Sequence, residues 1–83
     1  MTSQMRRSCA SIPANIAEGC GRGSDKDFAR FLQIAMGSAS ELEYFLLLAN
    51  DLGFLPNSSY NQLSKNVIEI KKMLTKFIEK CHN

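Results

Sequence analysis

Hydrophobic residues recur every three or four positions in three segments of the chain, the spacing of one face of an α-helix. The first segment covers residues 2–20, the second 25–52 and the third 58–82. Glycines separate the first two segments, and a glycine with a proline separates the last two. The pattern predicts an all-α protein with three helices in one domain, residues 1–83.

The first predicted helix contains Pro13 in its interior. Proline has no N–H to donate, so the carbonyl of Cys9 would lose its usual partner and the helix should bend there. We predict one kinked helix; two short helices, with Ser11 capping the second, are the alternative. Its apolar stripe consists of Met5, Cys9, Ile12, Ile16 and Cys20.

Residues typical of helix ends mark the second and third helices. Ser24 with Asp27 three residues later resembles a capping box, in which a side chain binds the free backbone N–H groups of the first turn. Gly53 lies just past the expected end of that helix, as C-terminal caps require. Ser59 with Gln62 predicts a second box at the start of the third helix.

The middle helix carries two apolar stripes instead of one. The first consists of Phe28, Leu32, Ala35, Ala39, Leu42 and Leu46. The second apolar stripe, about 120° around the helix, consists of Ile34, Phe45, Leu48 and Leu52. This helix should therefore be central, with the second stripe covered by another subunit or by a helix that the chain lacks.

Two further positions of the middle helix suggest close neighbours. Glu41 falls within the second apolar stripe and is expected to meet an arginine of a neighbouring helix or subunit. Gly37 costs about 1 kcal/mol relative to alanine inside a helix, which predicts that another backbone approaches it closely. A hinge at Gly37 is the alternative. Together with the second stripe, Glu41 completes the candidate oligomer interface.

The third helix has the clearest division into an apolar and a charged side. Its apolar positions alternate steps of four and three, as in a helical bundle. The predicted core of the whole protein consists of Ile12, Ile16, Phe28, Leu32, Leu42, Leu46, Leu63, Val67, Ile70, Leu74 and Phe77.

Composition and chemistry argue against several functional classes. The 83 residues are 45% hydrophobic and 22% charged, which is typical of a globular protein rather than a disordered one. No run of about 18 apolar residues exists to span a membrane, so we expect a cytoplasmic protein. The three cysteines form no C-x-x-C pair and are interpreted as buried thiols. His82 is the only histidine, too few ligands for a zinc site; we expect no metal and no cofactor.

No catalytic constellation emerges from the sequence. Glu41 and Glu43 are two residues apart and diverge on a helix, and the glycine-rich segment 19–23 lacks the Gly-Lys-Ser/Thr ending of a phosphate-binding loop. Asn15 and Glu18 form the sharpest polar pair. We interpret Asn15 as a partner for backbone near the proline and Glu18 as a partner of Arg22 or Arg30, with a polar binding or catalytic cluster as the alternative. We therefore expect a non-enzymatic protein.

Basic residues concentrate at the two ends of the chain. Residues 31–60 contain three acidic residues and no basic one, whereas residues 61–83 contain five lysines and two glutamates. The candidates for contact with nucleic acid are Arg6, Arg7, Arg22, Lys26, Arg30, Lys72, Lys76 and Lys80. We call Lys72, Lys76 and Lys80 the lysine row. The alternative for these three is a solvent-exposed face that binds no ligand.

Three stretches of the chain resemble one bacterial protein family. They are residues 11–19 (SIPANIAEG), 28–32 (FARFL) and 35–43 (AMGSASELE). They resemble the four-helix bundle family encoded in intervening sequences of 23S ribosomal RNA genes, to which the accessory variability protein of diversity-generating retroelements is related. Members of that family begin with a long helix that has no counterpart here, so this chain's three helices would correspond to the second, third and fourth.

The resemblance implies an up-and-down bundle that assembles as a homopentamer. The intervening-sequence proteins have no established biochemical activity, whereas the retroelement relative binds a reverse transcriptase and nucleic acid through a basic surface. Two hypotheses therefore stand. One is a self-assembling bundle that binds RNA or DNA weakly and without sequence preference; the other is a purely structural or partner-docking oligomer.

Overall fold

The computed structural model describes residues 2–82 and contains three α-helices joined by two short turns. Helix α1 spans Thr2–Cys20, α2 spans Asp25–Asp51 and α3 spans Asn57–Cys81. No β-strand occurs in this part of the chain. The all-α fold class is confirmed, and each helix begins and ends within one residue of its predicted bounds.

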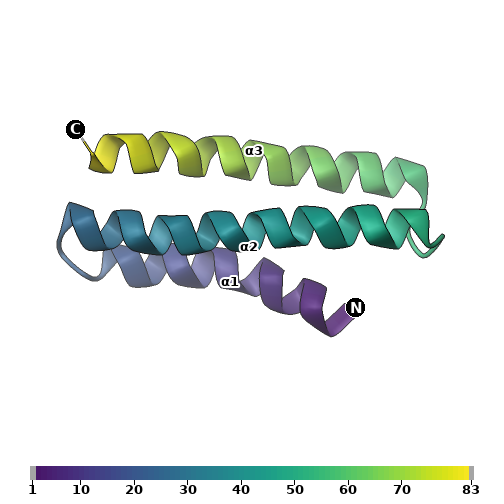
Figure 1. Ribbon diagram of the computed structural model, residues 1–83, viewed down its shortest axis with the longest axis horizontal. Helices are drawn as coiled ribbons and strands as arrows, with labels where there is room; N and C mark the ends of the chain where they lie inside the picture. Colours follow the sequence, from purple (N-terminus) through teal and green to yellow (C-terminus); the bar gives the residue numbers. More distant parts are fainter. Residues whose placement is uncertain (1, 83) are drawn as a thin grey trace.

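The three helices form a flat layer with α2 in the middle. Consecutive helices run in opposite directions, with α1 and α3 on either side of α2 (Figure 1). Over residues 2–82, α1 and α3 each pack against α2 but make no close backbone contact with one another. The molecule measures 44 × 22 × 13 Å. Helix α2 is central, as predicted, but within residues 2–82 only its two sequence neighbours pack against it, and the cover expected for its second apolar stripe is not part of this chain.

Helix α1 is continuous through Pro13, and its axis changes direction near the middle (Figure 1). The prediction of one kinked helix is therefore confirmed over two short ones. The side chain of Asn15 supports the backbone beside the proline, because its Nδ2 donates to the carbonyl oxygen of Ser11 at 2.8 Å. Pro13 itself is exposed.

The ends of α2 follow the local sequence closely. The Ser24 hydroxyl accepts a hydrogen bond from the backbone N–H of Asp27 at 3.2 Å, which caps the helix. At the other end, Gly53 has φ +80°, a conformation that glycine adopts without strain. The N–H of Phe54 bonds to the carbonyl of Ala49 at 2.9 Å, and that of Gly53 bonds to Asn50 at 3.1 Å. These two bonds form a Schellman motif, which turns the chain toward α3.

The start of α3 differs from the prediction. Its N-cap is Pro56, and no side chain caps the helix. Ser59 lies inside the first turn, and Gln62 instead donates to Asn66 at 3.1 Å. The predicted capping box at Ser59 is therefore wrong. Proline already has the backbone geometry needed before a helix, so the helix begins at Asn57, one residue before its predicted start, without a side-chain cap.

The core lies along both contacts of α2. Its buried apolar side chains are Ile12, Ala29, Phe31, Leu32, Ala35, Ala39, Leu46, Ala49, Val67, Leu74 and Ile78. Four further predicted core residues are partly buried against it: Ile16, Phe28, Leu42 and Ile70. Leu32 and Leu74 are almost fully buried, and side chains of this type stabilise a fold by about 1.5–3 kcal/mol each.

Two predicted core residues are on the surface. Leu63 is 41% exposed and Phe77 is 44% exposed, and Ile78 is buried instead of Phe77. The cause is the flat arrangement: α3 contacts only α2, so a single line of its surface is covered. The remaining part of its broad apolar face, including Met73, is open.

The interpretation of the cysteines as buried thiols is wrong for two of them. Cys9 and Cys20 are exposed, and Cys81 is partly buried. Along α1 the side that meets α2 contains Ser8, Ile12 and Gly19, all buried. Cys9 directly follows Ser8 and Cys20 directly follows Gly19, so both cysteines lie beside this buried line and not on it. No third helix of residues 2–82 covers them there.

Candidate interaction surfaces

A row of polar contacts joins α1 to α2. The buried Ser8 hydroxyl donates to Oε1 of Glu41, and the Ser38 hydroxyl donates to Oγ of Ser11 at 2.8 Å. Asn15 Nδ2 also reaches the Ser11 hydroxyl, at 2.9 Å. Among the described residues, no buried side-chain nitrogen or oxygen lacks a partner. Buried polar groups of this kind fix the register of two helices when all are satisfied.

These contacts supply structural roles for the sharpest polar residues of the sequence. Asn15 bonds within its own helix, and Glu18 pairs with Arg22 at 2.9 Å, one of its two expected partners. Arg30 lies instead 3.9 Å from Asp27. The predicted arginine partner of Glu41 is absent from the described part of the chain, because the residue of α1 that faces it is Ser8.

Gly19 sits where α1 and α2 come closest. A Cβ atom at this position would lie 2.9 Å from Cδ1 of Phe28 and 2.9 Å from Cβ of Phe31. Both distances are well below normal contact between carbon atoms, about 3.5–4.0 Å. Only glycine therefore allows the two helices to meet at this corner. Gly37 differs, since a Cβ there would meet nothing within 4 Å. The close backbone approach expected at Gly37 does not occur within the described chain, because this residue faces away from α1 and α3.

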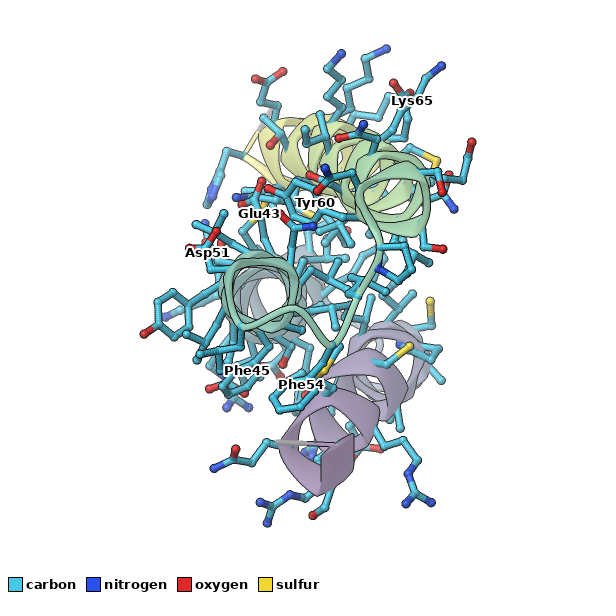
Figure 2. The ribbon with its side chains drawn as sticks, turned by 90° about the vertical axis from the view of Figure 1, so that its right-hand side faces the viewer. Glu43, Phe45, Asp51, Phe54, Tyr60 and Lys65 are labelled. Atoms are coloured by element: carbon cyan, nitrogen blue, oxygen red, sulfur yellow. The ribbon has the colours of Figure 1, made fainter. Side chains whose placement is uncertain are left out.

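An ion pair joins α2 to α3. Nζ of Lys71 lies 3.0 Å from Oε1 of Glu43, and both side chains are about one-third exposed. Figure 2 shows Glu43 on the side of α2 that faces α3. Sequence reasoning missed this pair, because the two residues are 28 positions apart and nothing local links them. The pair accounts for one of the three acidic residues of the segment 31–60.

The second apolar stripe is only partly covered by this chain. Ile34 is 43% exposed and Leu52 is 55% exposed, whereas Phe45 and Leu48 are partly buried. Two exposed aromatic residues extend the stripe and were not predicted: Tyr44 at 59% and Phe54 at 77%. Figure 2 shows Phe45 and Phe54 on the side of α2 nearer to α1. The α2 outer face is defined here as Ile34, Tyr44, Leu48 and Leu52.

The basic candidates fall into separate groups. Arg22 and Arg30 come together, because both guanidinium groups stack on the ring of Phe31, at 5.0 and 4.6 Å from its centroid. Each is also near an acidic residue. Arg6, Arg7 and Lys26 are exposed, and within residues 2–82 no ion pair or stacking contact joins them to that pair.

The lysine row lies on the exposed side of α3. Lys72 is 3.8 Å from Glu69, whereas Lys76 and Lys80 have no acidic partner within 4 Å among the described residues. A shallow depression beside them is lined by Met73, Lys76, Phe77, Glu79 and Lys80. Unpaired lysines beside exposed apolar side chains were not predicted, since Phe77 was expected in the core.

Residues 2–82 offer little to a metal or a membrane. They contain no group of three His, Cys, Asp or Glu side chains placed to hold a metal ion. None of the three helices is long and apolar enough to cross a membrane.

Comparison with protein families is decisive for the relationship inferred from the SIPANIAEG stretch. The model of the 23S rRNA-intervening sequence protein family matches residues 1–76. The chain belongs to this family. Comparisons with curated proteins and with solved structures found no match. The match covers α1, α2 and most of α3.

Proposed function

We propose that this 23S rRNA-intervening sequence protein is a non-catalytic, cytoplasmic helical bundle that works by assembling with copies of itself. The α2 outer face carries this proposal. Ile34, Tyr44 and Leu52 are each more than 40% exposed on one side of the central helix. Large apolar side chains exposed together on one side of a helix are a feature of interaction sites in globular proteins. Burial of such surface would stabilise an assembly by about 25 cal/mol per Å².

The flat shape also supports self-assembly. A chain of this size buries little of its surface alone, and here α1 and α3 each cover only one side of α2. An assembly would cover the open sides of all three helices. The resemblance to the pentameric relatives gives five as the expected number of copies.

The test is the mass of the full chain in solution, measured by light scattering across a range of concentrations. We expect a mass five times that of the 9.3 kDa chain. Replacing Ile34 and Leu52 with lysine should reduce it to that of a monomer. These two positions serve better than Phe45 and Leu48, which are partly buried within the chain, so that their replacement would also disturb folding. A wild-type chain that stays monomeric at all concentrations would refute the proposal.

Nucleic-acid binding is the second candidate function, favoured by the lysine row. Lys76 and Lys80 are free of acidic partners in the described chain and lie one turn apart. Repeated around an assembly, such a weak site would gain avidity. Because the contact would be to phosphates, binding to RNA or DNA should be independent of sequence and should fall steeply with salt. A reverse transcriptase is a further candidate partner by analogy with the retroelement relative.

A salt titration tests this second function. Wild-type protein should bind a labelled RNA and a labelled DNA at low salt, and a variant with Lys72, Lys76 and Lys80 replaced by glutamate should not. The matched control replaces Arg6, Arg7 and Lys26 with glutamate, which changes the net charge equally. Loss of binding in both variants to the same degree would indicate only overall charge. Unchanged binding in the lysine-row variant would refute a role of these lysines in nucleic-acid binding, and only the structural function would remain.

A further inference from the structure

The α2 outer face combines apolar and acidic side chains. Alongside its apolar residues, Glu41 and Asp51 are exposed, and the segment 31–60 has no basic residue to balance them. Figure 2 shows Asp51 projecting from α2 on the side away from α1 and α3. Gly37 lies between Ile34 and Glu41 with open space where a Cβ would be.

Helix α3 presents the opposite charge. Met73 is 53% exposed and Phe77 is 44% exposed, and the depression they line also contains Lys76 and Lys80. The α3 strip is defined here as these four residues. The whole helix contains five lysines and two glutamates. Its exposed apolar surface is therefore set among lysines, as that of α2 is set among carboxylates.

We propose that the α2 outer face of one copy packs against the α3 strip of the next copy, which deepens the proposed self-assembly by naming its two surfaces. The α2 outer face is flanked by the carboxylates of Glu41 and Asp51. The α3 strip carries Lys76 and Lys80, and Glu79 lines the same depression. Packing the two surfaces together would place lysines opposite carboxylates, which fixes orientation and partner choice. Packing either surface against itself would place like charges together, which is unfavourable.

The α3 strip is the shorter of the two surfaces and fits within the length of the other. Ile34 to Leu52 covers 18 residues, or about 27 Å at 1.5 Å per residue, and Met73 to Lys80 covers seven residues, or about 10 Å. A stable interface requires about 800 Å² from each partner, roughly 15% of the 5488 Å² surface of this chain.

The contact joins two different surfaces of the same chain. A contact of this kind is heterologous, so every copy has one α2 outer face and one α3 strip to offer, and copies add head to tail until a ring closes. The α3 strip would then be occupied in the assembly. Nucleic acid and the next copy would compete for Lys76 and Lys80, so in a closed ring the avidity of a repeated lysine site would not apply and nucleic acid would bind these lysines only on unassembled copies.

Two variants of the full chain test the proposal. The first replaces Ile34 and Leu52 with lysine and so blocks the α2 outer face. The second replaces Met73 and Phe77 with lysine and so blocks the α3 strip. Each variant alone should have the mass of a monomer. An equimolar mixture should give a dimer of one copy of each, and nothing larger, because only one compatible pair of surfaces remains.

The outcomes separate this inference from the proposed self-assembly. A wild-type monomer would refute self-assembly and this contact together. A wild-type oligomer with no dimer in the mixture would refute the contact alone. A second variant that still forms dimers by itself would show that α2 pairs with α2. Circular dichroism checks that each variant keeps its helices; a variant that does not is replaced by one with glutamine at the same two positions, with the same expected result.

Discussion

Replacing Gly19 with alanine should destabilise the protein, whereas the same replacement at Gly37 should stabilise it. At Gly19 the new Cβ would lie 2.9 Å from both Phe28 and Phe31. The contact with Phe31 is to its Cβ, which cannot move without the backbone. Overpacking of this kind costs about 1–3 kcal/mol, and the better helix propensity of alanine offsets at most about 1 kcal/mol. The net loss should be about 1–2 kcal/mol.

Gly37 is the matched control. It lies in the middle of α2, and a Cβ there meets nothing within 4 Å. Only the propensity gain applies, so the variant should be more stable by about 1 kcal/mol. The free energies of unfolding of the two alanine variants should therefore differ by about 2–3 kcal/mol, although each variant adds a single methyl group, one to α1 and the other to α2.

Urea unfolding followed by circular dichroism measures both effects. All proteins must be compared at one concentration, because association shifts the unfolding midpoint by mass action. A Gly19→Ala variant as stable as wild type would show that Phe28 and Phe31 do not close over this corner. A Gly37→Ala variant that is less stable would show that another molecule approaches the backbone there in the assembled protein.

Two further predictions rest on single positions. Ser24→Ala should lower the free energy of unfolding by about 1 kcal/mol, because the hydroxyl caps α2. Ser59→Ala should change it by less than about 0.5 kcal/mol. Urea unfolding measures both, and equal losses would contradict the assignment of the caps. In chains that retain one cysteine each, Cys9 and Cys20 should react with a thiol reagent faster than the partly buried Cys81, and a slower reaction at both would show that the open sides of α1 are covered.

Helix positions were predictable because their signals are local. The Ser24 cap, the positive-φ Gly53 and the spacing of apolar residues act within a few residues of each other. The one wrong capping assignment, at the start of α3, arose from two competing local signals. Both Pro56 and Ser59 can begin a helix, and the sequence does not show which backbone geometry the preceding turn imposes.

The candidate surfaces were harder to predict. The second apolar stripe was found because residues on one helix determine its faces, and the exposure of Ile34 and Leu52 agrees with it. Phe77 and Leu63 were misplaced because their periodicity fits a core equally well when a further helix covers them. The Glu43–Lys71 pair and the stacking of Arg22 and Arg30 on Phe31 depend on how helices lie against each other, which no local pattern reveals.

By itself the sequence determined the helices, their order and which sides are apolar, because backbone capping and side-chain periodicity act along one helix. Only the tertiary structure decided which apolar sides are buried. Helix α2 meets both neighbours, but α1 and α3 do not meet one another. The α2 outer face and the α3 strip thus remain open for the same reason: an apolar side chain is buried only where another element reaches it.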